Sequence, residues 1–371
     1  MKKIIVLGAG MVGRAMAIDL CREFEVTSAD IDKQNLSLLK NFPIKTIRCD
    51  LTSAEKIKSL IKKFDLVIGA VPGFMGFKTL QTVIRSKKNV VDISFFPEDP
   101  FKLDALAKKM NVTAIVDCGV CPGLSNIILG YHNKQMQIES YECMVGGLPS
   151  KKEWPYKYKA FFSPSDVIEE YIRPARIMEN GKEVIKEAMT DAELVDFEEV
   201  GTLEAFNTDG LRSLLVTMKI PNMIEKTLRY PGHIEIMKIF RETGFFSSDN
   251  VELKGKKVKP VELTSKLLFA FWKPAEDEDE FTIMRLKISG TQNNQKKDIE
   301  YLMVDRFDSK SKTSSMARTT GYTCTATARL ILDGSFTREG ICPPEYIGKE
   351  PGCYEKIISL LEERNIRIRA N

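Results

Sequence analysis

The chain has 371 residues, a formal net charge of +4, 43% hydrophobic residues and 29% charged residues. This length favours two domains over one, and the apolar fraction suffices for sizeable cores. The small net charge and the lack of a basic run with interleaved aromatic residues argue against a nucleic-acid partner. No apolar stretch approaches the ~20 residues of a membrane-spanning helix, so we expect no membrane partner.

The first thirty residues carry the strongest pattern. Residues 2–7 are predicted to form a buried strand, the sequence GAGMVG follows at once over 8–13, and a helix is expected over 14–22. A second apolar run ends in Ala29-Asp30. This order of strand, glycine turn, helix, strand and acid is typical of a dinucleotide-binding unit. The alternative is a Rossmann-like domain that binds nothing.

Each residue of the glycine motif has an expected role. Gly8 permits the tight turn, Gly10 lets the backbone approach a pyrophosphate, and Gly13 lets the helix pack against the strand. The helix start, at Met11 and Val12, presents free N–H groups and a positive dipole end to the phosphates.

Asp30 determines which cofactor is expected. Its carboxylate should accept hydrogen bonds from the adenosine ribose hydroxyls and repel a 2′-phosphate, so we predict NAD rather than NADP. Asp50 ends a third predicted strand over 46–50, before a predicted helix over 53–63. There it would either lie near the adenine or cap the following helix.

Further strands are predicted over 65–73, 89–94 and 112–117. Because the carboxyl ends of parallel strands face the ligand crevice, Val71 and Pro72 should lie along the cofactor. Asp92 and Cys118, at or just after such strand ends, are expected beside it. A loop over 117–126 then leaves the domain.

Cys118 and Cys121 form a C-x-x-C pair. It is either a redox pair, half of a zinc site, or a set of small residues in a tight turn. The only histidines are His132 and His233, and no second C-x-x-C lies nearby, so the tight turn is favoured and no metal is predicted. Eight scattered cysteines indicate reduced thiols, and we expect a cytoplasmic protein.

From about residue 120 the alternation of strands and helices ends. A helix is predicted over 261–271, and the acidic run over 276–280 is predicted to be a solvated loop. Two further helices are predicted over 323–332 and 354–363. Strands are expected over 139–147, 194–197, 281–289, 301–305 and 314–321.

These elements predict an α/β protein of three segments. Residues 1–120 form a Rossmann domain with a doubly wound parallel sheet, and residues 121–322 form a second, α+β domain whose strands pair antiparallel. Residues 323–371 are helices that return to the Rossmann domain.

Four later segments carry a family resemblance: 117–126 (DCGVCPGLSN), 146–149 (GGLP), 204–212 (EAFNTDGLR) and 227–233 (TLRYPGH). Together with the dinucleotide unit, they resemble the saccharopine dehydrogenase-like oxidoreductases, and look closest to the lysine 6-dehydrogenase branch. The resemblance covers nearly the whole chain. It implies an inserted substrate domain with a mixed sheet, and a homodimer or homotetramer built through that domain. Cys121 departs from relatives, which often carry a small apolar residue there.

An amine-oxidising dehydrogenase needs a base, because the amine lone pair must be free to stabilise the iminium that forms as hydride leaves. Asp92 and Asp117 are candidate bases at strand ends, where a partly desolvated carboxylate has a raised pKa. His233 is another, because histidine titrates near neutral pH. The alternatives are turn capping by either aspartate and a purely structural role for His233.

A substrate carboxylate would need a cation. Arg212 and Arg229 lie in polar turns, where a guanidinium can bind a carboxylate through two parallel hydrogen bonds. Arg212 might instead pair with Asp209. Thr227 could add a hydroxyl contact.

Tyr158 is a further candidate for substrate contact. It is flanked by Lys157 and Lys159, which either steer carboxylates or are solvated.

Three functions are open at this point. The first is NAD-dependent oxidative deamination of L-lysine at its ε-carbon, giving the 6-semialdehyde, which cyclises. The second is saccharopine dehydrogenase, whose substrate has three carboxylates and needs more cationic contacts. The third is a non-catalytic NAD-binding protein.

Overall fold

The structure, a computed structural model, describes residues 1–275 and 277–371 and contains two compact units. The first unit comprises residues 1–135 and 317–366, and the second comprises 136–316 and 367–371. The chain therefore changes unit at 135–136, at 316–317 and at 366–367. The domain boundary expected near residue 120 lies before the change at 135–136, and the boundary expected near residue 322 lies after the change at 316–317.

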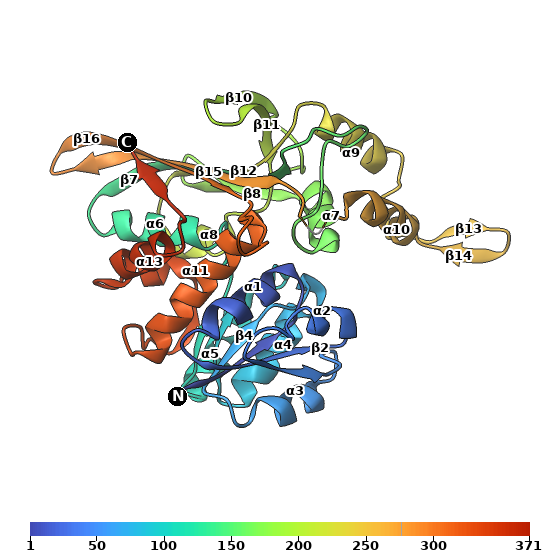
Figure 1. Ribbon diagram of the computed structural model, residues 1–371. Helices are drawn as coiled ribbons and strands as arrows, with labels where there is room; N and C mark the ends of the chain where they lie inside the picture. Colours follow the sequence, from blue (N-terminus) through green and yellow to red (C-terminus); the bar gives the residue numbers. More distant parts are fainter. Residues whose placement is uncertain (276) are drawn as a thin grey trace. The chain divides into compact units, whose positions relative to one another are not determined.

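A seven-stranded parallel sheet forms the centre of the first unit, in the order β17-β6-β5-β4-β1-β2-β3 (Figure 1). The chain winds outward from β1 in both directions, so strand order reverses between β1 and β4, as in a doubly wound fold. This confirms the predicted class of the N-terminal half. The strands are β1 (Lys3–Leu7), β2 (Glu25–Asp30), β3 (Ile44–Arg48), β4 (Leu66–Gly69), β5 (Asn89–Asp92), β6 (Thr113–Ile115) and β17 (Gly340–Cys342).

Helices account for most of the remaining described residues of this unit. Residues of β1 and β4 such as Ile5 and Val67 are fully buried, as expected for parallel strands covered on both faces. No helix of the described chain is long and apolar enough to cross a membrane. The helices are α1 (Met11–Leu20), α2 (Lys33–Ser37), α3 (Ala54–Ile61), α4 (Gly73–Arg85), η1 (Pro100–Leu103), α5 (Asp104–Lys109), α6 (Leu124–Asn133), α11 (Ser315–Leu332), α12 (Pro344–Lys349) and α13 (Cys353–Glu362). The first two residues of α11 belong to the second unit.

Helix α6 begins at Leu124, inside the segment predicted as a loop, and belongs to the first unit. It packs closely on α12. A Cβ atom on Gly130 would lie 2.2 Å from the Glu345 carbonyl oxygen, and one on Gly348 would lie 2.0 Å from the Ile127 carbonyl oxygen. Two glycines, one on each helix, thus allow a backbone contact that holds α6 in this unit.

The segment predicted as a strand over 314–321 is the first part of helix α11. Its threonines favour a strand locally, but a buried carboxylate caps the helix: the Ser315 and Met316 amides donate to Glu280. Glu280 is fully buried, and burial raises its pKa to about 8. The prediction of a solvated acidic loop is therefore wrong at Glu280, and Glu276 lies outside the described residues.

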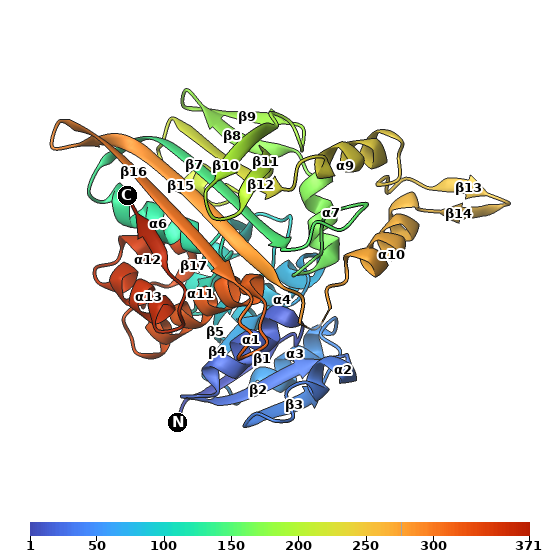
Figure 2. The same cartoon turned by 45° about the horizontal axis from the view of Figure 1, so that its top comes forward.

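The second unit contains a nine-stranded mixed sheet, with β10-β11-β12-β7-β15-β16-β18 in order, β8 paired with β12, and β9 paired with β8 (Figure 2). Strands β12 and β7 are parallel and the other described pairs are antiparallel, as predicted. The strands are β7 (Gln137–Pro149), β8 (Ala175–Glu179), β9 (Lys182–Lys186), β10 (Glu193–Phe197), β11 (Gly201–Asn207), β12 (Asn222–Arg229), β15 (Glu280–Gln292), β16 (Gln295–Arg306) and β18 (Ile368–Ala370).

An aromatic core lies against this sheet. Tyr171, Phe206 and Trp272 are among its largest fully buried side chains. The other elements of the unit are α7 (Pro164–Ile172), α8 (Leu214–Thr217), α9 (His233–Glu242), α10 (Pro260–Trp272) and a separate hairpin of β13 (Val251–Leu253) and β14 (Lys256–Val258).

A buried ion cluster joins α11 and the segment after α13 to α1. Asp19, which is 1% exposed, accepts hydrogen bonds from Arg329 Nη1 at 3.0 Å, Arg364 Nε at 2.7 Å and Thr325 Oγ1 at 2.6 Å. Burial alone would raise the pKa of Asp19, but the two guanidinium groups and the hydroxyl outweigh it and lower the pKa. The C-terminal return to the first domain is thus held by charge as well as by apolar packing.

The substitution Asp19→Asn should destabilise the first unit by about 3 kcal/mol at neutral pH, because it removes the buried carboxylate shared by Arg329 and Arg364 and leaves them only the half-exposed Glu23. Since the pKa of Asp19 is lower in the folded than in the unfolded chain, its contribution is present above the unfolded pKa and is lost as pH falls through the folded pKa. Urea unfolding at neutral and acidic pH measures this. The exposed Asp249→Asn is the control, and equal stability of Asp19→Asn and wild type at neutral pH would contradict the prediction.

Candidate active site

The glycine turn after β1 is shaped by two close backbone contacts and one open position. Gly8 has a φ of +110°, and a Cβ on it would lie 2.3 Å from the Ala70 carbonyl oxygen. A Cβ on Gly13 would lie 2.2 Å from the Gly8 carbonyl oxygen, whereas nothing lies within 4 Å of the corresponding position on Gly10. Gly10 is also the N-cap of α1 and supplies no side-chain cap. The open space beside uncapped helix N–H groups suits a pyrophosphate.

Asp30 at the end of β2 is hydrogen-bonded to this turn. Its Oδ2 accepts a hydrogen bond from the Ala9 amide at 2.7 Å, and its Oδ1 accepts one from the Asp32 amide at 2.8 Å. The side chain is half-buried. A carboxylate has about four acceptor sites, so both oxygens retain lone pairs for ribose hydroxyls. The turn and Asp30 together therefore fit the adenosine and pyrophosphate of a dinucleotide.

Val71, Pro72 and Asp50 were predicted along the cofactor. Strand β4 ends at Gly69, earlier than predicted, and Pro72 is the N-cap of α4 with Val71 buried before it. Asp50 follows β3 and accepts hydrogen bonds from the amide and the hydroxyl of Thr52, at 3.0 and 2.6 Å, which lower its pKa. Asp50 therefore caps the turn that precedes α3, whereas the N-cap of the helix itself is Ser53.

Asp92 ends β5 and is fully buried. Its Oδ1 accepts a hydrogen bond from the Ser94 amide at 2.8 Å, its Oδ2 accepts one from the Ser94 hydroxyl at 3.3 Å, and Oδ2 lies over Gly69 of β4. Burial raises the pKa of Asp92 to about 8, against the opposing effect of both Ser94 bonds and with a further increase from the Asp117 charge. Asp92 therefore holds a proton at neutral pH.

Asp117 lies in the loop after β6, 3% exposed, with a φ of +54°. The left-handed region is unfavourable for a residue with a side chain, and such strain gathers at functional sites. The next amide, that of Cys118, donates to the Asp92 carbonyl at 3.0 Å. The structure thus brings the two predicted bases together, on adjacent strand ends and within electrostatic range.

The C-x-x-C segment is a tight turn, which agrees with the favoured interpretation. The Gly119 amide donates to the Pro122 carbonyl at 3.0 Å. The Cys118 thiol is buried and lies 3.3 Å from the Thr327 hydroxyl, and burial raises its pKa to about 12. A thiol with that pKa is a poor nucleophile and a poor metal ligand.

In the second unit, one face of β12 carries a buried polar row. Glu225, Thr227 and Arg229 are 4%, 4% and 2% exposed, and their spacing of two places them on the same face of the strand. The Thr227 hydroxyl lies 2.9 Å from that of Thr208, which in turn donates to Glu225 at 2.8 Å.

Arg229 is held by an internal network. Its Nη2 donates to Glu170 at 2.6 Å, its Nε donates to the Tyr171 hydroxyl at 3.1 Å, and its guanidinium carbon lies 4.5 Å from the centre of the Tyr158 ring. A third donor, Nη1, bonds the Leu228 carbonyl. The guanidinium is therefore neutralised and stacked within the unit, which counts against its predicted role with a substrate carboxylate.

His233 belongs to the same network. Its Nε2 lies 2.9 Å from the Tyr171 hydroxyl and its Nδ1 lies 2.8 Å from the Tyr156 carbonyl. Burial, and then the nearby Arg229 charge, lower its pKa to about 3. An imidazole with that pKa is too weak a base to take a proton from an ammonium group, so these contacts favour the structural alternative.

Arg212 lies in a segment that its neighbours hold firmly. It is 8% exposed with a φ of +52°. Asp209, its alternative partner, is bound by both Arg176 Nε and Nη2 at 2.9 Å. Gly210 is packed on the Glu225 carboxylate, where a Cβ would lie 2.0 Å from Oε2. The segment with Arg212 and the β12 position of Thr227 are thus linked through Glu225 and Thr208.

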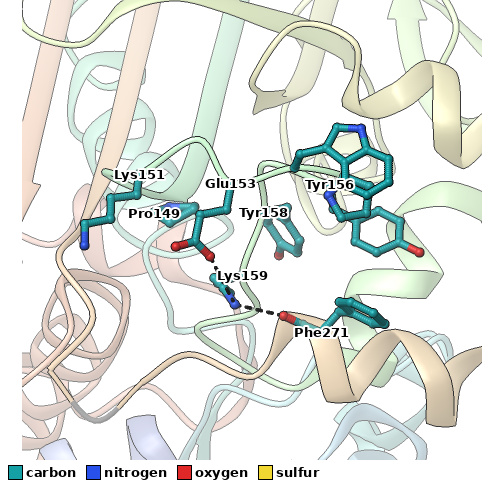
Figure 3. A pocket seen from close by; sticks show the side chains of 9 residues that line it. Pro149, Lys151, Glu153, Tyr156, Tyr158, Lys159 and Phe271 are labelled. Atoms are coloured by element: carbon teal, nitrogen blue, oxygen red, sulfur yellow. Dashed lines mark hydrogen bonds and ion pairs between the residues drawn. The ribbon is translucent and has the colours of Figure 1, made fainter.

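A pocket in the second unit includes Tyr158 (Figure 3). Lys159 crosses it and donates to the Phe271 carbonyl at 3.0 Å, while Lys157 donates to the Pro231 carbonyl at 3.1 Å. The two lysines therefore hold backbone carbonyls rather than being simply solvated. The pocket is lined by Pro149, Lys151, Glu153, Trp154, Pro155, Tyr156, Tyr158, Lys159 and Phe271.

The predicted residues form two groups within each unit. In the first unit these are the glycine turn with Asp30, and Asp92 with Asp117. In the second they are Arg212 with Thr227, and Arg229 with His233 and Tyr158. The sequence analysis missed Glu170, Tyr171 and Glu225, since nothing in a single sequence shows that helix α7 faces β12.

The comparisons with known proteins cover nearly the whole chain. A model of the saccharopine dehydrogenase NADP binding domain matches residues 4–115, and a model of the saccharopine dehydrogenase C-terminal domain matches residues 119–366. The structure of apo saccharopine dehydrogenase (L-Glu forming) from Saccharomyces cerevisiae matches with a TM-score of 0.78 at 20% identity, covering 100% of this chain and 99% of that chain.

Two relatives set the scale of similarity. Mitochondrial alpha-aminoadipic semialdehyde synthase of Rattus norvegicus is 26% identical over 278 residues, which is 70% of this chain and 30% of that protein. Saccharopine dehydrogenase (NADP(+), L-glutamate-forming) of Pyricularia oryzae is 24% identical over 289 residues, which is 72% of this chain and 63% of that protein. The chain thus spans less than a third of the first protein and under two thirds of the second.

The doubly wound sheet with its glycine turn defines a nicotinamide nucleotide-binding domain, here joined to a mixed-sheet domain. The chain belongs to the saccharopine dehydrogenase family.

The substitution Asp92→Asn should change how stability depends on pH. From about pH 4 to about pH 8 the folded chain holds a proton on Asp92 that the unfolded chain has released, so Asp92 lowers the free energy of unfolding as pH rises. Asparagine has no such titration. Its Oδ1 can still accept from the Ser94 amide, and its Nδ2 can donate to the Ser94 hydroxyl oxygen. The variant should therefore gain stability relative to wild type between about pH 5 and about pH 9, measured by urea unfolding. Asp50→Asn, at a carboxyl with a lowered pKa, should show no such gain. Parallel curves for Asp92→Asn and wild type would contradict the pKa of about 8.

Proposed function

We propose that the protein is an NAD-dependent oxidoreductase that deaminates L-lysine at its ε-carbon. The reaction would convert lysine in its ε-ammonium form, water and NAD⁺ into the 6-semialdehyde, ammonium, NADH and a proton, and the semialdehyde would cyclise to piperideine-6-carboxylate. The observation that carries the choice of a small substrate is the state of Arg229. Its guanidinium is neutralised by Glu170, so of the two predicted arginines only Arg212 remains a candidate for a substrate carboxylate.

Asp92 and Asp117 are the proposed groups that handle the proton of the substrate. Burial raises the pKa of Asp92 to about 8, so Asp92 holds a proton at neutral pH and the neighbouring Asp117 is the acceptor in the forward step. The Asp117 carboxylate then accepts the proton of the substrate ammonium, which frees the lone pair that expels hydride from the ε-carbon. Bound NAD supplies the hydride acceptor.

Asp30 supports NAD as the cofactor. Its two oxygens are fixed by the Ala9 and Asp32 amides beside the glycine turn, where the 2′-position of an adenosine ribose is expected. A fixed carboxylate there favours a 2′-hydroxyl and repels a 2′-phosphate. The matched domain model and the Pyricularia oryzae relative are both named for NADP, so this preference is a specific claim about this chain.

The second candidate is oxidation of saccharopine at its CH–NH bond. It is favoured by the names of the relatives and by Lys151 of the Tyr158 pocket, which adds a positive charge, while Lys159 there is paired with Glu153 at 4.0 Å. A non-catalytic NAD-binding role is the third, and the buried Asp92–Asp117 pair counts against it. We further propose a cytoplasmic homodimer or homotetramer.

A substrate panel tests the main proposal. Purified protein with NAD should form NADH with L-lysine, measured at 340 nm, and give less signal with ornithine or saccharopine. In reverse, the semialdehyde with ammonia should consume NADH faster than the semialdehyde with glutamate. Turnover of saccharopine without turnover of lysine would select the second candidate. Tight NAD binding without turnover of any amine would select the third.

The substitution Asp30→Ser should relax the choice between the two nucleotides. Removing the carboxylate removes both the ribose contact and the repulsion of a 2′-phosphate. The association constant for NAD divided by that for NADP should therefore fall at least about tenfold. Isothermal titration with each nucleotide measures this without relying on turnover. Asp32→Ser, two residues further on, is the matched control and should keep the wild-type ratio. An unchanged ratio in Asp30→Ser would show that this acid does not set the preference.

A further inference from the structure

Helix α11 carries a row of buried threonines inside the first unit. Thr319, Thr323 and Thr327 are all 0% exposed, and their spacing of four residues places them on one face of the helix. Threonine is a weaker helix former than leucine or alanine, because its branched side chain is restricted there. A buried hydroxyl is also costly unless it is hydrogen-bonded. The bonds of these side chains therefore show what this face of the helix does.

Thr327 is bonded outside its own helix. Its hydroxyl oxygen accepts a hydrogen bond from the Cys118 thiol, with 3.3 Å between sulfur and oxygen. Because burial raises the pKa of that thiol to about 12, the thiol stays protonated and is the donor. Thr323, one turn earlier, instead donates to the Thr319 carbonyl of α11 itself at 2.8 Å. Thr327 thus connects α11 to the turn that follows β6.

Cys118 is held at two points and is the direct neighbour of Asp117. Its amide donates to the Asp92 carbonyl at 3.0 Å, and its thiol donates to Thr327. Asp117 itself has a φ of +54°. A side chain persists in this region of backbone conformation only where the surrounding structure holds it there. The two bonds of Cys118 supply such a hold on the backbone that carries the Asp117 carboxylate.

Two further contacts of α11 lie close to Thr327 along the chain. A Cβ on Gly119 would lie 3.2 Å from Thr320 Cγ2, so α11 packs directly on the turn after Cys118. A Cβ on Gly321 would lie 3.5 Å from the Val12 carbonyl oxygen, in the first turn of α1. One helix therefore contacts both the turn that follows Asp117 and the helix that begins at the glycine turn.

We propose that Thr327 is a positioning residue, which holds the Asp117 carboxylate in place for proton transfer through its bond to the Cys118 thiol. A proton acceptor must lie within hydrogen-bond reach of the proton that it takes, so a small displacement of Asp117 slows the reaction. The inference rests on the proposed role of Asp117. It also gives the Cys118 thiol a purpose other than redox or metal chemistry.

The substitution Thr327→Val tests this role, because valine has nearly the shape of threonine but no hydroxyl. With an amine that wild type oxidises, kcat should fall about fivefold or more, since a weak S–H···O bond is lost and the acceptor is misplaced. The dissociation constant for NAD, measured by isothermal titration, should change less than about twofold, since the glycine turn is untouched. Thr327→Ser keeps the hydroxyl and should restore most of the wild-type kcat.

Thr323→Val is the matched control. Thr323 is the same residue type with the same burial on the same helix face, but its hydroxyl bonds its own helix. This variant should keep the wild-type kcat. Circular dichroism and thermal unfolding check that both valine variants fold. An equal loss of kcat in the two variants, or no loss in Thr327→Val, would overturn the proposal.

Hydrogen exchange tests the positioning without any turnover. The Cys118 amide should exchange about fivefold faster in Thr327→Val than in Thr323→Val, because losing the thiol bond eases local opening of the turn. If wild type oxidises no amine, the proposed function fails, whereas this comparison still decides whether Thr327 holds the turn. Equal exchange of the Cys118 amide in the two variants would overturn the inference.

A double-mutant cycle tests whether the two side chains act as one unit. Cys118→Ala and Thr327→Val remove opposite partners of the same bond, so the double variant should lower kcat no further than the more damaging single change. If the two losses instead multiply, Thr327 does not act through the Cys118 thiol and the proposal fails.

Discussion

The first unit depends on the close approach of three backbone segments, at the end of β1, the end of β4 and the start of α1. A side chain on Gly8 would overlap the Ala70 carbonyl, and one on Gly13 would overlap the Gly8 carbonyl. With both glycines in place, α1 packs directly on the point where strand order reverses. Its N-terminus then lies beside the strand end that carries Asp30, which is where a dinucleotide needs backbone donors and a carboxylate.

Buried charge is handled in two different ways in this protein. Arg229 and Asp19 are paired with opposite charges, so each keeps its ionised form without exposure to water. Asp92 and Glu280 instead have pKa values raised to about 8 by burial. Paired charges serve to fix structure, because removing one partner is costly. A carboxyl poised to gain or lose a proton near neutral pH suits proton transfer at Asp92, whereas Glu280 is occupied in capping α11.

The two faces of α10 link the core of the second unit to its surface. Trp272 anchors the helix beside the aromatic rings of Tyr156, Tyr158 and Tyr171. Because that anchor fixes the rotation of the helix, Leu263 and Leu267 are left facing outward. Packing inside the unit thus determines which apolar residues of α10 remain exposed.

The sequence by itself determined the doubly wound first unit, the glycine turn and the positions of Asp30, Asp92 and Asp117 at or just after strand ends. These features follow from local patterns, since buried parallel strands are continuously apolar and only glycine fits the turn. Only the tertiary structure decided that 315–321 is helical, that Arg229 is neutralised by Glu170, and that His233 is buried beside a cation. Each of these depends on contacts between residues far apart in the chain, such as Glu280 with Ser315, which no local pattern of residues encodes.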